Sequence, residues 1–135
     1  MLPAATRLSL LSLLLLAAAC HPNRSDPKTV APTIQQLEGT WLASHEENRG
    51  DTLVYRPNTY HFPPARGRTG FALKPFGRFE QFDLAPTDGL ASRTGTWTAY
   101  RNTRLRIHLN QGPEPDYTLQ IISLENQVLK LRRRP

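Results

Sequence analysis

The feature that most limits the possible folds is a two-residue alternation of apolar and polar side chains in the C-terminal part of the sequence. It is clearest in "RLRIHLN" (104–110), where Leu105, Ile107 and Leu109 alternate with Arg, Arg and His. The runs "DYTLQIISL" (116–124) and "VLKLRRR" (128–134) repeat it, and Gly, Pro and Asn separate the runs. Because successive side chains of a strand point to opposite faces, the pattern predicts antiparallel strands with one apolar and one wet face.

Shorter alternating runs occupy the preceding residues, near 37–44, 53–55, 60–62, 71–84 and 95–99, and no stretch shows sustained helical periodicity. We therefore predict one all-β domain at 36–135. Its expected form is a small antiparallel up-and-down (meander) β-barrel, closed or half-open, of about 7–8 strands, since closure removes exposed strand edges. The side chains expected inside are Trp41, Trp97, Ile107, Leu119, Ile121 and Leu131.

The tripeptide Gly-Thr-Trp occurs twice, at 39–41 and at 95–97. A glycine lets a strand bend sharply, and a tryptophan two residues later can close one end of a barrel. A shared structural use is the favoured interpretation, with coincidence as the alternative.

The N-terminal segment is typical of an export signal. Residues 1–19 carry a single charge, Arg7, followed by a run of Leu and Ala that is too short for a membrane-spanning helix, which needs roughly 20 apolar residues. Directly behind it stands Cys20, the only cysteine, so no disulfide can form within the chain. The run "LAAAC" resembles a bacterial lipobox, which implies a lipidated Cys20. An ordinary secretory signal with an unmodified cysteine and a buried thiol are the alternatives.

Residues 20–35 have the composition of a flexible linker, with three prolines among small polar residues. They would tether the domain to a membrane. The position after Cys20 holds His21 and not an acidic residue, which favours the outer membrane of a bacterial envelope.

The stretch "LEGTWLAS" at the start of the domain and the later "GTW", in an all-β body behind such a cysteine, resemble the lipocalin-like domains of bacterial lipoproteins. The resemblance covers roughly 37–133 and implies a barrel open at one end that binds a small apolar molecule. Arg106 or Tyr100 would then meet a polar head group. A filled barrel that serves as a binding or structural module is the alternative. The expected pocket residues are Trp41, Tyr55, Phe71, Phe79 and Trp97.

The formal net charge of +6 is unevenly distributed. No acidic residue lies at 52–79 or at 89–113, although both stretches hold several arginines. Contact with anionic lipid or envelope polysaccharide is one interpretation, and a solvated surface without a partner is another. Docking of another envelope protein through the loop 63–78 is a third, whereas nucleic acid is not expected for an exported protein. The anionic-surface candidates are Arg66, Arg68, Lys74, Arg78, Arg104 and Arg106.

The sequence offers little catalytic chemistry. "SHEEN" (44–48) pairs His45 with Glu46, but the second histidine of a zinc-peptidase helix is absent, because position 49 is Arg. There is no Gly-x-Ser-x-Gly elbow and no phosphate-binding glycine loop. We therefore expect neither an enzyme nor a cofactor or metal site.

Overall fold

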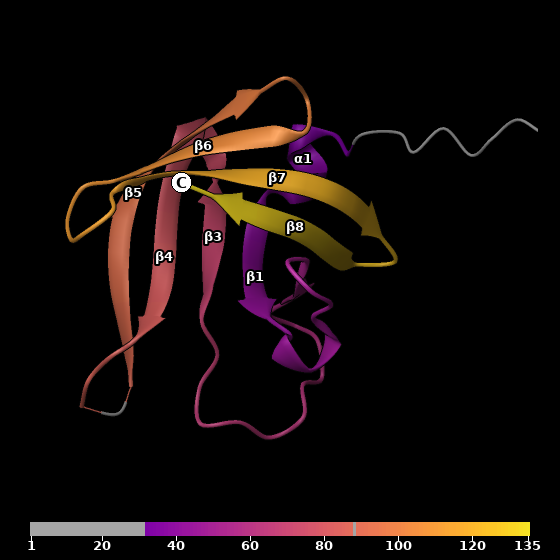
Figure 1. Cartoon of the computed structure of the whole chain (residues 1–135), viewed down its shortest axis with the longest axis vertical. Helices are drawn as coiled ribbons and strands as arrows, with labels where there is room; N and C mark the ends of the chain where they lie inside the picture. Colours follow the sequence, from indigo (N-terminus) through magenta and orange to yellow (C-terminus); the bar gives the residue numbers. More distant parts are fainter. Residues whose placement is uncertain (1–31, 88) are drawn as a thin grey trace, which may run out of the picture.

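The computed structural model describes residues 32–87 and 89–135. The predicted signal peptide, Cys20 and most of the predicted linker lie outside this part of the chain. Eight antiparallel strands form a closed barrel, which confirms the predicted fold class (Figure 1). The elements are α1 (Ile34–Leu37), β1 (Gly39–Ala43), η1 (His45–Glu47), β2 (Leu53–Pro57), β3 (Gly70–Lys74), η2 (Pro75–Gly77), β4 (Arg78–Leu84), β5 (Leu90–Tyr100), β6 (Arg104–Leu109), β7 (Asp116–Glu125) and β8 (Val128–Arg134).

Strands β3 to β8 form a continuous meander, and the first two strands close it in an unexpected order. Around the barrel the order is β1-β2-β8-β7-β6-β5-β4-β3, so β1 lies between β2 and β3. In a complete up-and-down order, β1 would pair with β8. Here β1 pairs with β3, in a register that sets Gly39 opposite Leu73, and β2 pairs with β8. As both β2 and β3 are antiparallel to β1, the segment 58–69 between them must run back past β1.

This connection replaces the strand that the aromatic pair Tyr60 and Phe62 had suggested. The two rings pack edge to face, with centroids 4.9 Å apart. The Arg56 guanidinium lies 4.5 Å from the Tyr60 ring centre, and that of Arg68 lies 4.5 Å from the Phe62 ring centre. The alternation of aromatic residues thus reflects stacking on arginines, a cation–π contact, and the expected strand is absent from the described residues.

The barrel interior is filled by apolar side chains. Leu105, Ile107 and Leu109 of β6 are buried while the residues between them are exposed, as the alternation predicts. Of the six side chains expected inside, five are buried, and Trp97 is half-buried and packs against the core. The largest side chains with almost no exposed surface are Leu73, Phe79, Ile107, Leu109, Leu129 and Leu131.

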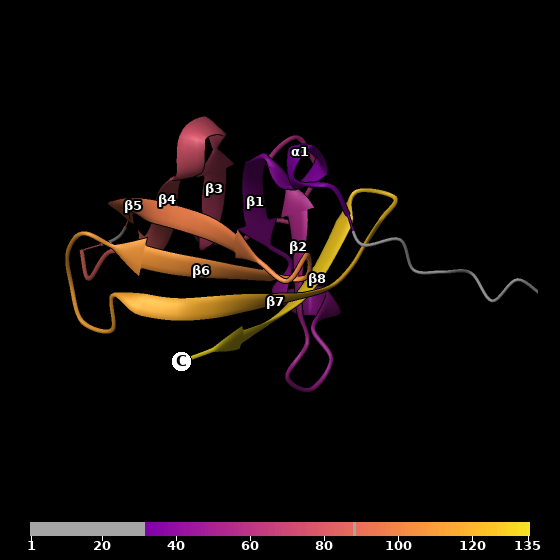
Figure 2. The same ribbon diagram turned by 90° about the horizontal axis from the view of Figure 1, so that it is seen from above.

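The two tryptophans of the repeated tripeptide both lie at the α1 end of the barrel. The indole N–H of Trp41 donates a hydrogen bond to the Leu37 carbonyl (2.8 Å). That of Trp97 donates to the Lys74 carbonyl at the end of β3 (2.9 Å). Buried indoles need such partners for their polar end, and α1 lies beside these strand ends in both views (Figures 1 and 2). This end of the barrel is therefore closed.

Candidate functional site

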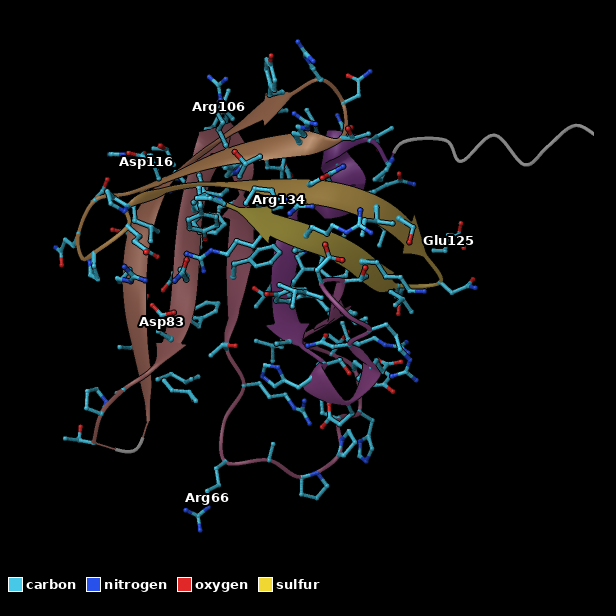
Figure 3. All side chains as sticks on the ribbon, in the orientation of Figure 1. Arg66, Asp83, Arg106, Asp116, Glu125 and Arg134 are labelled. Atoms are coloured by element: carbon cyan, nitrogen blue, oxygen red, sulfur yellow. The ribbon has the colours of Figure 1, made fainter. Side chains whose placement is uncertain are left out.

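The barrel mouth, at the end opposite α1, holds a cavity of about 250 Å³. It lies where β3 begins and β4 ends, and Figure 3 shows Asp83 on that part of β4. Its floor is apolar, because Phe71 and Leu119 face it from the core. The full lining comprises Tyr55, Thr69, Gly70, Phe71, Gln81, Phe82, Asp83, Tyr117, Leu119 and Arg133.

A chain of polar side chains forms one wall of this mouth cavity. The Tyr117 hydroxyl donates a hydrogen bond to the amide oxygen of Gln81, which is itself buried. The Gln81 amide nitrogen donates to Asp83 (2.8 Å), and Arg93 Nε donates to the other Asp83 oxygen (2.9 Å). Asp83 thus has a cationic partner, and its charge is compensated inside the protein.

Arg133 is the uncompensated charge of the mouth cavity. Its guanidinium lies 3.9 Å from the centre of the Tyr117 ring, and among the described residues no carboxylate lies within 4.0 Å of it. Burial raises the pKa of Tyr55 and of Tyr117 above the usual 10.0, although the nearby charge of Arg133 acts in the opposite direction. Both phenols therefore remain protonated at neutral pH, next to an exposed cation.

The structure divides the five predicted pocket residues. Tyr55 and Phe71 line the mouth cavity, with ring centroids 5.0 Å apart. Phe79 stacks behind Phe71 at 5.8 Å and is buried in the core. Trp41 and Trp97 belong to the opposite, closed end. Arg106 and Tyr100, expected at the rim, lie instead on the outer face, because their strand neighbours Ile107 and Ala99 belong to the core side. Figure 3 shows Arg106 pointing away from the barrel.

The polar side chains that give the mouth cavity its chemistry were not predicted from the sequence: Gln81, Asp83, Tyr117 and Arg133. The alternation in "DYTLQIISL" puts Tyr117 on the same face as Leu119 and Ile121, but its position at the mouth depends on the register of β7 with β6 and β8. Arg133 follows two inward-facing leucines at a two-residue spacing, Leu129 and Leu131. That spacing is the one sequence signal that places Arg133 on the inner side of β8. The neighbouring arginines at 132 and 134 hide this signal.

The predicted basic residues are not one surface. Arg68 is buried, and this corrects its assignment to an anionic contact: it donates to Glu46 (2.7 and 3.0 Å) and to the carbonyls of Ala43 and Pro63. Lys74 pairs with Glu80 at 2.5 Å. The remaining candidates, Arg66, Arg78, Arg104 and Arg106, are exposed and have no carboxylate partner among the described residues.

Two ion pairs hold η1 in place, one with Arg68 of the segment 58–69 and one with Arg56 of β2, and they predict an acid-sensitive stability. Hydrogen bonds from Arg68 lower the pKa of Glu46 from 4.5 to about 2, and hydrogen bonds from Arg56 do the same for Glu47. A carboxyl with a depressed pKa stabilises the fold fully above its unfolded pKa and loses this contribution as the pH falls through its folded pKa. We expect the thermal unfolding temperature to fall between pH 4.5 and about 2, and the fall to be smaller for Glu46→Gln. Glu125→Gln, at an exposed position, should behave as wild type; an identical fall in both variants would contradict the assignment.

Within 32–87 and 89–135 there is no group of three or more His, Cys, Asp or Glu side chains that could hold a metal ion. None of the helices described is long and apolar enough to cross a membrane. Comparisons with protein-family models, with curated proteins and with solved structures found no match.

Proposed function

We propose that this chain is a membrane-anchored lipoprotein of the bacterial cell envelope, with a non-catalytic, lipocalin-like binding module. The anchor is supported by the apolar run before Cys20 and by the linker composition that follows it. Mass spectrometry of the mature N-terminal peptide should find Cys20 as the first residue, carrying diacylglyceryl and acyl groups such as palmitate. An intact Met1 or a free thiol on Cys20 would contradict the anchor.

The observation that carries the binding role is the mouth cavity of an otherwise filled barrel. Ligand pockets for drug-sized molecules usually enclose about 300–1,000 Å³, so 250 Å³ suits a smaller molecule. A long acyl chain would have to displace Phe79, which is 2% exposed. These sizes support a small ligand held at the mouth, and they count against a carrier of large hydrophobic molecules.

The lining favours a small amphiphilic anion. A carboxylate would accept hydrogen bonds from Arg133, and charge-assisted bonds of this kind are about twice as strong as neutral ones. An apolar or aromatic body would rest on Phe71 and Leu119. The acidic groups nearby are Asp83, which Arg93 neutralises, and Glu114 and Asp116, which share an adjacent hollow with Arg133 but do not pair with it.

Benzoate and benzamide, which have the same shape and differ in charge, test this site by calorimetric titration of the purified protein. We expect benzoate to bind and benzamide to bind more weakly. Because a hydrogen bond to a charged group contributes about 1.5–3 kcal/mol, Arg133→Gln should weaken benzoate binding by about tenfold or more. Arg104→Gln removes an exposed arginine of the outer face and should leave binding unchanged.

Three results would count against the small-anion site: equal binding of the two probes, equal loss in both variants, or no binding of benzoate at all. An oleate titration followed by tryptophan fluorescence separates the competing carrier function. Tight, stoichiometric oleate binding would require the core to open and would favour that function.

A further inference from the structure

The turn between β3 and β4 presents a phenylalanine to solvent. Phe76 is 96% exposed, the highest value for any large apolar side chain of the described residues. Its backbone lies in the left-handed region (φ 61°, ψ 32°), which costs a residue with a Cβ atom about 1–2 kcal/mol. Gly or Asn would adopt this conformation at less cost. The Phe76 ring buries almost no surface within the protein, so packing inside the fold does not offset this backbone cost. Contact of the ring with an apolar partner outside the protein would explain why a phenylalanine stands here.

Other exposed apolar side chains lie at the same end of the barrel as this turn. Gly39, which follows α1, pairs with Leu73 near the end of β3, so α1 and η2 are neighbours. The Trp97 indole N–H donates a hydrogen bond to the Lys74 carbonyl, which places the last part of β5 at the same end. Ile34 of α1 is 41% exposed and Tyr100 of β5 is 36% exposed. Figures 1 and 2 show α1 and the β5–β6 hairpin at one end of the barrel.

Basic side chains accompany these apolar ones. Arg101 and Arg106 lie over the Tyr100 ring, with guanidinium carbons 5.1 and 4.7 Å from its centre. Arg78 follows η2, Arg104 begins β6, and Figure 3 shows Arg106 pointing away from the barrel. None of these four pairs with a carboxylate of the described residues. Glu38 is an exposed acid at this end, and Glu80 is paired with Lys74.

The N-terminal side of the domain joins the barrel at this same end. Residue 32 leads directly into α1, so any anchor at Cys20 reaches the barrel beside the apolar and basic side chains. The 12 residues from 20 to 31 could span at most roughly 40 Å at about 3.3 Å each. A tether of that reach lets this end touch the membrane surface.

We propose that the α1 end of the barrel rests on an anionic bilayer, with the Phe76 ring in the interface and the four arginines among the lipid phosphates. An aromatic tip flanked by cations is the chemistry of interfacial binding, where apolar burial and attraction to anionic lipid add. The mouth cavity, at the other end, then faces away from the membrane. This inference rests on the proposed lipid anchor.

The test places a fluorescent label at two positions of the lipidated full chain. Because Cys20 is the only native cysteine and its thiol would be modified, Phe76→Cys and Arg66→Cys each offer one reactive thiol. Arg66 is exposed on the 58–69 segment, away from the α1 end (Figure 3). The labelled proteins are bound to vesicles of phosphatidylethanolamine and phosphatidylglycerol. Acrylamide, an uncharged quencher, then measures the exposure of each label to water, and flotation measures anchoring.

We expect the label at position 76 to be several-fold less accessible to acrylamide than the label at position 66, and to lose part of this protection on phosphatidylcholine vesicles. Equal accessibility in protein that floats with the vesicles would overturn the orientation while leaving the anchor standing. Protection of position 66 alone would do the same. Equal protection on neutral and anionic vesicles would overturn the role of the arginines. Failure to float identifies a missing anchor instead.

Discussion

Replacing Phe79 with alanine is expected to lower the free energy of unfolding by about 3–5 kcal/mol. Phe79 is 2% exposed, stacks on Phe71 with ring centroids 5.8 Å apart and meets the Tyr117 ring edge to face at 6.5 Å. Its removal takes apolar contacts from the centre of the barrel and leaves a cavity that the closed sheet cannot collapse to fill. Urea denaturation followed by tryptophan fluorescence measures the change.

Phe76→Ala is the matched control, since it also removes a phenyl ring, but from a residue that is 96% exposed. We expect it to change the free energy of unfolding by less than about 0.5 kcal/mol, as surface substitutions usually do. Similar losses from both variants would contradict the assignment of Phe79 to the core. Together with the vesicle experiment, this pair of variants would distinguish Phe79, which stabilises the barrel, from Phe76, which does not contribute to its stability.

Local sequence patterns predicted most strands of the barrel, because a strand with one solvent-exposed face alternates apolar and polar residues along its own sequence. The strands β6, β7 and β8 each alternate as expected. The order of the first two strands could not be predicted in this way. Whether β1 pairs with β3 or with β8 depends on the path of the segment 58–69. The sequence does not show this path, because the aromatic residues of the segment stack on arginines and do not form a strand.

The mouth cavity was only partly predictable for a related reason. Tyr55 and Phe71 were found because aromatic residues on inner faces are visible in the sequence. Arg133 and Asp83 were not, since charged residues near strand ends are expected in solvent. Only the pairing of β8 with β7 and of β4 with β5 places them at one opening.

The two ends of the barrel therefore differ in chemistry. The α1 end is closed by tryptophans whose N–H groups are satisfied by backbone carbonyls, and its outer surface combines apolar tips with arginines. The opposite end is open and carries phenols, a compensated carboxylate and the guanidinium of Arg133, which pairs with no carboxylate of residues 32–87 and 89–135. A tether that enters at the closed end leaves the open end accessible, so the two proposals are compatible within one molecule.

Gly95→Ala is expected to destabilise the barrel by about 3 kcal/mol or more, at or above the top of the range of about 1–3 kcal/mol that is usual for overpacked sites. Gly95 lies within β5, between Phe79 of β4 and Leu109 of β6. A Cβ atom at this position would lie 2.1 Å from the His108 carbonyl oxygen and 2.9 Å from the Leu109 Cα. Both are backbone atoms, so relief requires β6 to move away and its pairing with β5 to weaken. Denaturant unfolding of the variant measures the loss.

The neighbouring residue offers a control on the same strand. Thr96→Ala changes an exposed side chain and should cost less than about 1 kcal/mol, the span of strand propensities. Gly39 of the first Gly-Thr-Trp has no atom within 4 Å of the position of a Cβ, but its φ of +135° is one that L side chains rarely adopt. Gly39→Ala should therefore cost about 1–3 kcal/mol through backbone strain alone. Equal and small losses of unfolding free energy in Gly95→Ala and Thr96→Ala would contradict the close approach of β5 and β6 at Gly95. The glycine of the second Gly-Thr-Trp would then have no structural explanation.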